Sequence, residues 1–92
     1  MPKENDAYTS LLNRLYQYSQ WPSIYRFKFI FETDNHLGLI IEGWFGKNAK
    51  SRYMQSSANK YLSLTVDVEM ATPEEVIAIY KKGADIPGLV ML

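Results

Sequence analysis

The sequence contains no cysteine among its 92 residues. This absence excludes disulfide frameworks, zinc–thiolate sites and cysteine nucleophiles. The sequence also lacks a charge excess, because ten basic residues balance ten acidic ones. Affinity for nucleic acid comes largely from the neutralisation of phosphates by a basic excess. We therefore expect no nucleic-acid partner, and no cofactor is indicated by the composition.

Long apolar runs are also missing. Residues 1–6 are polar and lack the apolar run of a secretory signal. No apolar stretch approaches the roughly 20 residues that a bilayer-spanning helix needs. We therefore expect a cytoplasmic protein that does not associate with membranes.

The length is sufficient for one domain and too short for two. We predict a single domain over residues 1–92. Within it, residues 1–22 form an N-terminal tail, helix and turn, and residues 23–92 form the core.

Two segments alternate with a period of two, which predicts strands that turn one face towards a core. In the first, residues 24–32, the inward positions are aromatic: Tyr25, Phe27, Phe29 and Phe31. In the second, residues 61–70, they are aliphatic: Leu62, Leu64, Val66, Val68 and Met70. A polar, weakly alternating segment at 49–56 predicts an edge strand, and residues 89–92 predict a last strand.

Three other segments have helical spacing. The first has a stripe of Tyr8, Leu11, Leu12, Leu15 and Tyr16, with Asp6 as its expected cap and Trp21-Pro22 as its stop. The second has a stripe of Leu37, Ile40, Ile41, Trp44 and Phe45, with Asp34 as its expected cap and Gly46 as its stop. The third begins at Thr72-Pro73-Glu74-Glu75, which is a capping box with proline at the first helical position.

After the first helix, the expected order is strand, helix, strand, strand, helix, strand. This order predicts an α+β, ferredoxin-like βαββαβ two-layer sandwich, with a four-stranded antiparallel sheet and an extra N-terminal helix. The first and third strands are central neighbours in this topology. Arg26 and Lys28 would then lie near Asp67 and Glu69 on the uncovered face, where opposite charges across a ladder are stabilising.

The segment Ser57-Ala58-Asn59-Lys60 has the spacing of a serine nucleophile and its lysine in penicillin-recognising enzymes. In those enzymes the serine lies at a helix N-terminus inside a cleft, whereas here the segment joins two expected strands. Asn59 tolerates left-handed backbone angles, which are typical of hairpin turns. A solvated lysine also remains protonated and cannot act as a base. We interpret the segment as a bend and assign no catalytic residues.

The same hairpin resembles that of the YbeD-like family, small bacterial proteins of unassigned function. The shared features are dispersed along the chain: Trp21-Pro22 before the first strand, Glu74 to Val76 at the start of the last helix, the terminal Leu89 to Leu92, and a hairpin motif. We take the hairpin as a family motif or partner contact, formed by Ser56, Ser57, Asn59, Lys60, Tyr61 and Ser63.

The resemblance implies a ferredoxin-like fold that is similar to the ACT domain, a regulatory module that binds amino acids and often pairs sheet to sheet. It implies no catalytic residues, because none are established for the family. ACT ligand sites typically have glycine in the loop after the first strand, whereas this chain has Thr33-Asp34-Asn35-His36.

His36 is the only histidine, and a metal site would need two or three more ligands from elsewhere. We therefore predict no metal site. The alternative that remains for this loop is a ligand contact made by Asp34, Asn35 and His36.

These observations predict a non-enzymatic binding or regulatory module that contacts a partner protein or a small metabolite. One alternative is an ACT-like amino-acid sensor with its site at a homodimer interface. Another is an RNA-binding ferredoxin-like domain, which the inward position of the aromatic residues disfavours. The first helix is expected to pack on its own domain or, alternatively, on a second copy.

Overall fold

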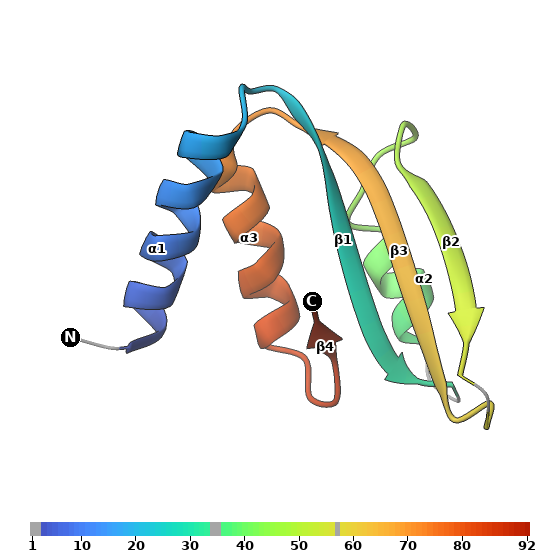
Figure 1. The fold of residues 1–92 in the computed structure, drawn as a ribbon. Helices are drawn as coiled ribbons and strands as arrows, with labels where there is room; N and C mark the ends of the chain where they lie inside the picture. The colour runs from blue at the N-terminus through green and yellow to red at the C-terminus, as the bar shows by residue number, and fades with distance from the viewer. Residues whose placement is uncertain (1–2, 34–35, 57) are drawn as a thin grey trace.

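The computed structural model describes residues 3–33, 36–56 and 58–92. The helices and strands follow one another as α1 (Lys3–Tyr18), β1 (Ser23–Glu32), α2 (Leu37–Glu42), β2 (Lys50–Gln55), β3 (Tyr61–Met70), α3 (Pro73–Ala84) and β4 (Val90–Met91). The four strands form one sheet in the order β2-β3-β1-β4, with antiparallel neighbours throughout (Figure 1). This confirms the predicted ferredoxin-like α+β fold.

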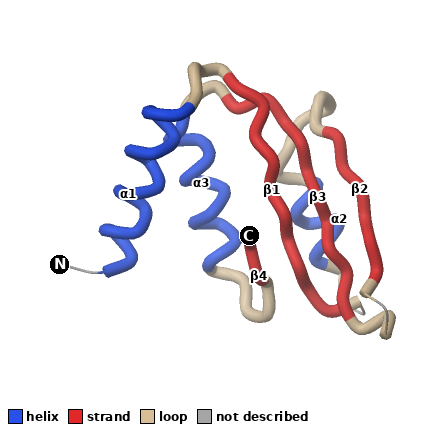
Figure 2. Tube along the Cα trace, viewed as in Figure 1, coloured by secondary structure: helices blue, strands red, loops and turns tan. Residues whose placement is uncertain are grey.

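The central pair is β1 and β3, which are matched residue for residue from Ser23 opposite Met70 to Glu32 opposite Tyr61. Figure 2 shows these two long strands side by side, with β2 beyond β3 and the short β4 on the other side of β1. The predicted edge strand at 49–56 is slightly shorter, Lys50–Gln55, and the predicted last strand at 89–92 is reduced to Val90–Met91.

The inward rows of β1 and β3 form the core, as the period-two pattern predicts. The fully buried side chains there belong to Phe27, Phe29, Phe31, Leu64 and Val66, and they pack with Ile41, Val76 and Ile79 from the helices. Tyr25 is partly buried, and its hydroxyl lies 2.9 Å from that of Tyr80. The aromatic row is therefore turned inwards, and among the described residues no helix covers the opposite face of the sheet (Figure 1).

The helix α3 begins as predicted. The Thr72 hydroxyl accepts a hydrogen bond from the Glu75 N–H at 3.3 Å, and Pro73 occupies the first helical position. The capping box is shifted by one residue, because the Glu75 carboxylate accepts from the N–H of Ala71 at 3.1 Å. Two backbone donors before and within the first turn are thereby satisfied.

The predicted extent of α2 is wrong at both ends. Its N-cap is His36, without a side-chain cap bond, and the expected cap Asp34 lies outside the described residues. The helix ends at Glu42 with Gly43 as its C-cap, not at Gly46. The N–H groups of Trp44 and Phe45 bond to carbonyls three residues back, so the chain continues as turns. The helical spacing persists past Gly43 because both rings still pack against the core.

The helix α1 packs on α3, so the expectation that it packs on its own domain is confirmed. Figure 1 shows α1 outermost, with α3 between it and the sheet. Its C-terminal end is fixed by the Trp21 indole, which donates to the Leu15 carbonyl at 3.1 Å. The Tyr16 hydroxyl lies 2.6 Å from both carboxylate oxygens of Glu74 at the start of α3. Asp6 lies inside the helix, which begins at Lys3, so it is not the cap.

Candidate functional site

At one end of the sheet, the loop after β1 contacts the β2–β3 hairpin, and both segments were candidate sites in the sequence. Thr33, after β1, donates its N–H to the Lys60 carbonyl and its hydroxyl to the Asn59 carbonyl, both at 2.9 Å. Glu32 and Tyr61 complete the lining of a cleft of about 350 Å³ at this end. The β1–β3 register brings the loop and the hairpin together, because Glu32 at the end of β1 is opposite Tyr61 at the start of β3.

The hairpin geometry supports its interpretation as a bend. Asn59 has a φ of 56°, which is the left-handed conformation predicted for it. The Ser56 hydroxyl accepts from the N–H groups of Lys60 and Tyr61, each at 3.2 Å, so this oxygen stabilises the turn. Ser57 lies outside the described residues.

The remaining residue of the hairpin motif is remote from the turn. Ser63 lies within β3, between Ile30 on β1 and Met54 on β2. It therefore belongs to the face of the sheet and not to the cleft at its end.

His36 is exposed and lines a neighbouring cleft of about 330 Å³, together with Phe31, Gly38, Leu39, Tyr53 and Leu62. Its predicted companions Asp34 and Asn35 lie outside the described residues. Among the residues that the structure does describe, no group of three or more metal-ligating side chains comes together.

The face of the sheet opposite the helices, which we call the open face, carries a band of four cations. In one row across the strands, Arg26 and Lys50 flank Asp67, and in the next row Lys28 and Arg52 flank Thr65. We call Arg26, Lys28, Lys50 and Arg52 the cationic band. Within these two rows, the four cations share a single carboxylate.

The neighbouring cations affect the pKa of Asp67. Its carboxylate pairs with Arg26, with Nε and Oδ1 2.7 Å apart. The hydrogen bonds from Arg26 lower the pKa of Asp67, partial desolvation opposes this, and the nearby charges of Arg26, Arg52 and Lys50 lower the pKa further. The ionised carboxylate is therefore favoured, and positive charge still predominates in the band.

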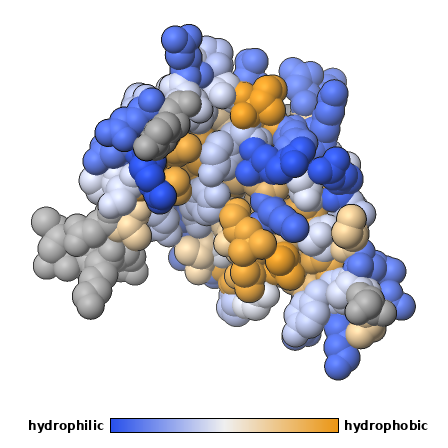
Figure 3. All heavy atoms as spheres, viewed as in Figure 1, coloured by the Kyte–Doolittle hydropathy of each residue, from blue (hydrophilic) through white to orange (hydrophobic). Residues whose placement is uncertain are grey.

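Apolar side chains flank the cationic band on the open face. Ile24 is 67% exposed at one end of β1, and Met54 is 72% exposed on β2. At the other side, Val90 is opposite Ile30, and Leu92, which bonds to the Lys28 carbonyl, is 64% exposed. Figure 3 shows hydrophobic side chains gathered over β4 and the adjoining part of β1, next to a hydrophilic band that crosses the sheet.

Sequence reasoning placed the Arg26–Asp67 pair correctly but missed this mixed surface. Lys28 lies opposite Thr65, and Glu69 lies opposite Ile24, so the second expected charge pairing is not formed directly. The apolar side chains at this edge could have been predicted from the alternation along Val90, Met91 and Leu92. Met91 packs against the core, so Val90 and Leu92 on either side of it lie on the opposite face.

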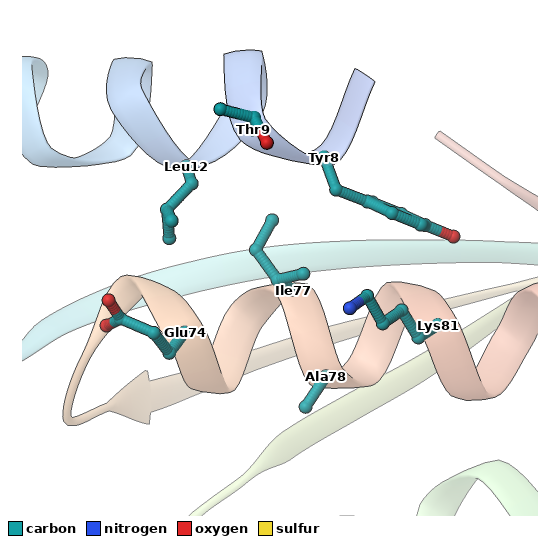
Figure 4. Close-up of a pocket in the computed structure, with 7 residues that line it drawn as sticks. All are labelled: Tyr8, Thr9, Leu12, Glu74, Ile77, Ala78 and Lys81. Carbon is teal, nitrogen blue, oxygen red and sulfur yellow. The ribbon is translucent and has the colours of Figure 1, made fainter. Parts of the chain in front are cut away.

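A third cleft lies between the helices α1 and α3. Its volume is about 360 Å³, and its lining includes Tyr8, Leu12, Ile77 and Lys81. Figure 4 shows Ile77 pointing from α3 towards α1, between Leu12 and Tyr8. The Lys81 ammonium lies 5.3 Å from the centre of the Tyr8 ring, a cation–π contact that links the two helices.

Comparisons with known proteins give one match. A family model described as "Protein of unknown function (DUF493)" matches residues 17–92, which include the whole sheet together with α2 and α3. No curated protein and no solved structure matches the chain. Over the described residues, no helix has the length and apolar character required to cross a membrane.

Proposed function

The chain belongs to the DUF493 family, which is the family of the YbeD-like proteins that its hairpin resembles, and we propose that it is a non-enzymatic module that binds a partner protein through the open face of its sheet. The partner surface that fits is acidic and bears apolar side chains. The module would act by covering that surface of the partner or by bringing the partner to another molecule.

One observation carries the proposal: a sheet face that no described helix covers combines exposed apolar side chains with four cations grouped around one carboxylate. Ile24, Met54 and Leu92 are each more than 60% exposed. Exposed apolar side chains that lie beside charged ones on one uncovered face support an interaction surface. The cationic band supplies orientation and faster association with an acidic surface.

A protein partner is better supported than RNA. RNA-binding sheets of this topology stack bases on aromatic side chains at the middle of the central strands. Here the aromatic row of β1, from Tyr25 to Phe31, packs into the core. The open face at the middle of β3 carries Thr65 and Asp67 instead.

A protein partner is also better supported than a small metabolite. Metabolite sites are concave and orient their ligands with a few well-placed polar groups. Among the described residues, no polar or charged side chain is buried. The cleft between Thr33 and Asn59 uses their polar groups to join the loops.

The test is affinity capture with the wild-type protein and with the double variant Lys28→Glu/Arg52→Glu. The matched control is Arg14→Glu/Lys81→Glu, which reverses the same number of positive charges on α1 and α3, away from the open face. A captured protein is then purified, and its binding is measured at low and high salt, because exposed charge interactions are screened by salt.

We expect a protein that binds the wild type and the control equally and loses at least about tenfold in affinity to the open-face variant. Binding that is equal for all three folded proteins would contradict the proposal. So would recovery of no partner that binds after purification. Circular dichroism establishes that each variant is folded.

A further inference from the structure

The strand β2 forms an open edge of the sheet. It has β3 on one side only, and all six of its residues, Lys50–Gln55, are exposed. Figure 1 shows it as the outermost strand on the side away from α1. An open edge strand presents a row of backbone donors and acceptors that is able to pair with another chain.

The direction of these backbone groups follows from the hairpin. Ser56 donates its N–H to the Tyr61 carbonyl at 2.9 Å, so these two residues form a hydrogen-bonded pair of the β2–β3 ladder. Hydrogen-bonded and non-hydrogen-bonded pairs alternate along antiparallel strands. The backbone groups of Arg52 and Met54 therefore face β3. Those of Ser51, Tyr53 and Gln55 face away from the sheet.

Apolar side chains lie along the same edge on the helix side of the sheet. Tyr53 is 45% exposed, with its hydroxyl bonded to the Glu42 carboxylate of α2. Leu39 of α2 lines the same cleft as Tyr53 and is 75% exposed. The short α2 thus leaves both the backbone edge and the side chains beside it uncovered.

We propose that a second copy of this chain pairs with this edge, β2 against β2 in antiparallel orientation, with its two-fold axis at Tyr53. Tyr53 then lies opposite the partner's Tyr53, and Ser51 lies opposite the partner's Gln55. All three outward-facing residues of each strand are paired. The two four-stranded sheets become one continuous sheet of eight strands.

The charges and the backbone directions select this register. An axis at Arg52 places two arginines directly opposite each other, which is destabilising. It also leaves Gln55 opposite a residue beyond the strand. An axis at Met54 leaves Ser51 unmatched in the same way. Only the axis at Tyr53 pairs all three outward-facing residues.

The same register is acceptable on the open face. Arg52 lies opposite the partner's Met54, and Lys50 lies opposite the partner's Ser56. The two Arg52 side chains are diagonal neighbours, where the separation is larger. The balanced charge of the chain, ten basic and ten acidic residues, adds no overall repulsion between copies. This proposal does not depend on the partner protein proposed for the open face.

Two double variants test both the dimer and its register. In Ser51→Glu/Gln55→Glu, carboxylates face each other across the two-fold axis twice. In Ser51→Glu/Gln55→Lys, the same two positions form opposite-charge pairs with the partner. Within one chain the two positions are four residues apart on a strand, roughly 13 Å, so their mutual effect is small. Sedimentation velocity over a wide protein concentration range measures the dissociation constant of the dimer.

We expect the wild type to dimerise, the Glu/Glu variant to dissociate, and the Glu/Lys variant to dimerise at least about tenfold more tightly than the Glu/Glu variant. Hydrogen exchange should protect the amide of Tyr53 only in the dimer. A wild type that stays monomeric at near-millimolar concentration overturns the proposal. Two folded variants with equal dissociation constants also overturn it, because the two positions are then not opposed. Thermal melts establish that both variants are folded.

Discussion

Arg26 and Asp67 lie opposite each other on the two central strands and form a bidentate ion pair. The Arg26 Nε lies 2.7 Å from Oδ1 of Asp67, and Nη2 lies 3.0 Å from Oδ2. The pair lies in the direct cross-strand position that the register gives it. It holds the Arg26 guanidinium against Asp67 on the open face.

This pair predicts a defined pH dependence of stability. The pKa of Asp67 is lowered from its ordinary value of 3.8, chiefly by the hydrogen bonds from Arg26. A lowered pKa in the folded state means that the pair stabilises the fold above the unfolded pKa, and that this contribution is lost as the pH falls through the folded value. Asp67→Asn should lower the Tm by at most a few degrees at neutral pH, because the pair is exposed.

The measurement is the Tm of the wild type and of Asp67→Asn from pH 7 down to about pH 2. The difference should shrink as the pH falls below 3.8. Glu69→Gln is the control, since Glu69 lies opposite Ile24. A difference between wild type and Asp67→Asn that persists unchanged in acid would show that the ion pair is not its cause.

The Tyr53 ring lies close against Gly38. A Cβ at Gly38 would lie 2.6 Å from the Tyr53 hydroxyl and 3.1 Å from the nearest ring carbon. Gly38→Ala must therefore displace the ring, and we expect it to lower the free energy of unfolding by about 1–2 kcal/mol. Urea denaturation measures the change.

Gly46→Ala is the matched control, because nothing lies within 4 Å of a Cβ built there. Tyr53→Phe in the Gly38→Ala background should recover part of the loss, since it removes the closest contact. Equal effects of the two alanine substitutions would rule out the close approach of the ring to Gly38.

The hairpin between β2 and β3 turns at Asn59. Asn59 has a positive φ of 56°. Left-handed backbone costs an alanine roughly 1 kcal/mol or more, whereas glycine adopts it freely. Asn59→Ala should therefore unfold at lower urea concentration than Asn59→Gly, by about 1 kcal/mol in the free energy of unfolding. Ala58→Gly at the adjacent position should bring no gain. Equal stability of Asn59→Ala and Asn59→Gly would contradict the left-handed turn.

Much of the fold could be predicted because its determinants are local. The alternation of Phe27, Phe29 and Phe31 identifies β1, and Thr72 with Pro73 identifies the start of α3. The end of α2 could not be predicted in this way. The core contacts of Trp44 and Phe45 continue the helical spacing after Gly43 has ended the helix.

The candidate sites depend on register and on layer coverage, which are not local. Thr33 and Asn59 are 26 residues apart in sequence, and they meet only because β1 and β3 are matched to their ends. The charges of Arg26 and Asp67 indicated the open face. The exposed apolar residues Met54 and Leu92 become part of it only once β2 and β4 are placed at the edges.

Site-specific photo-crosslinking in cells can establish whether the open face binds a partner protein. A photoreactive residue is placed at Ile24 or Leu92 on the open face, and at Arg14 or Asp85 on the helical side as controls. We predict crosslinks to one distinct protein from Ile24 and Leu92 and none to that protein from the control positions. The open face would not be the binding surface if crosslinks formed only from the control positions, or if no position gave a crosslink.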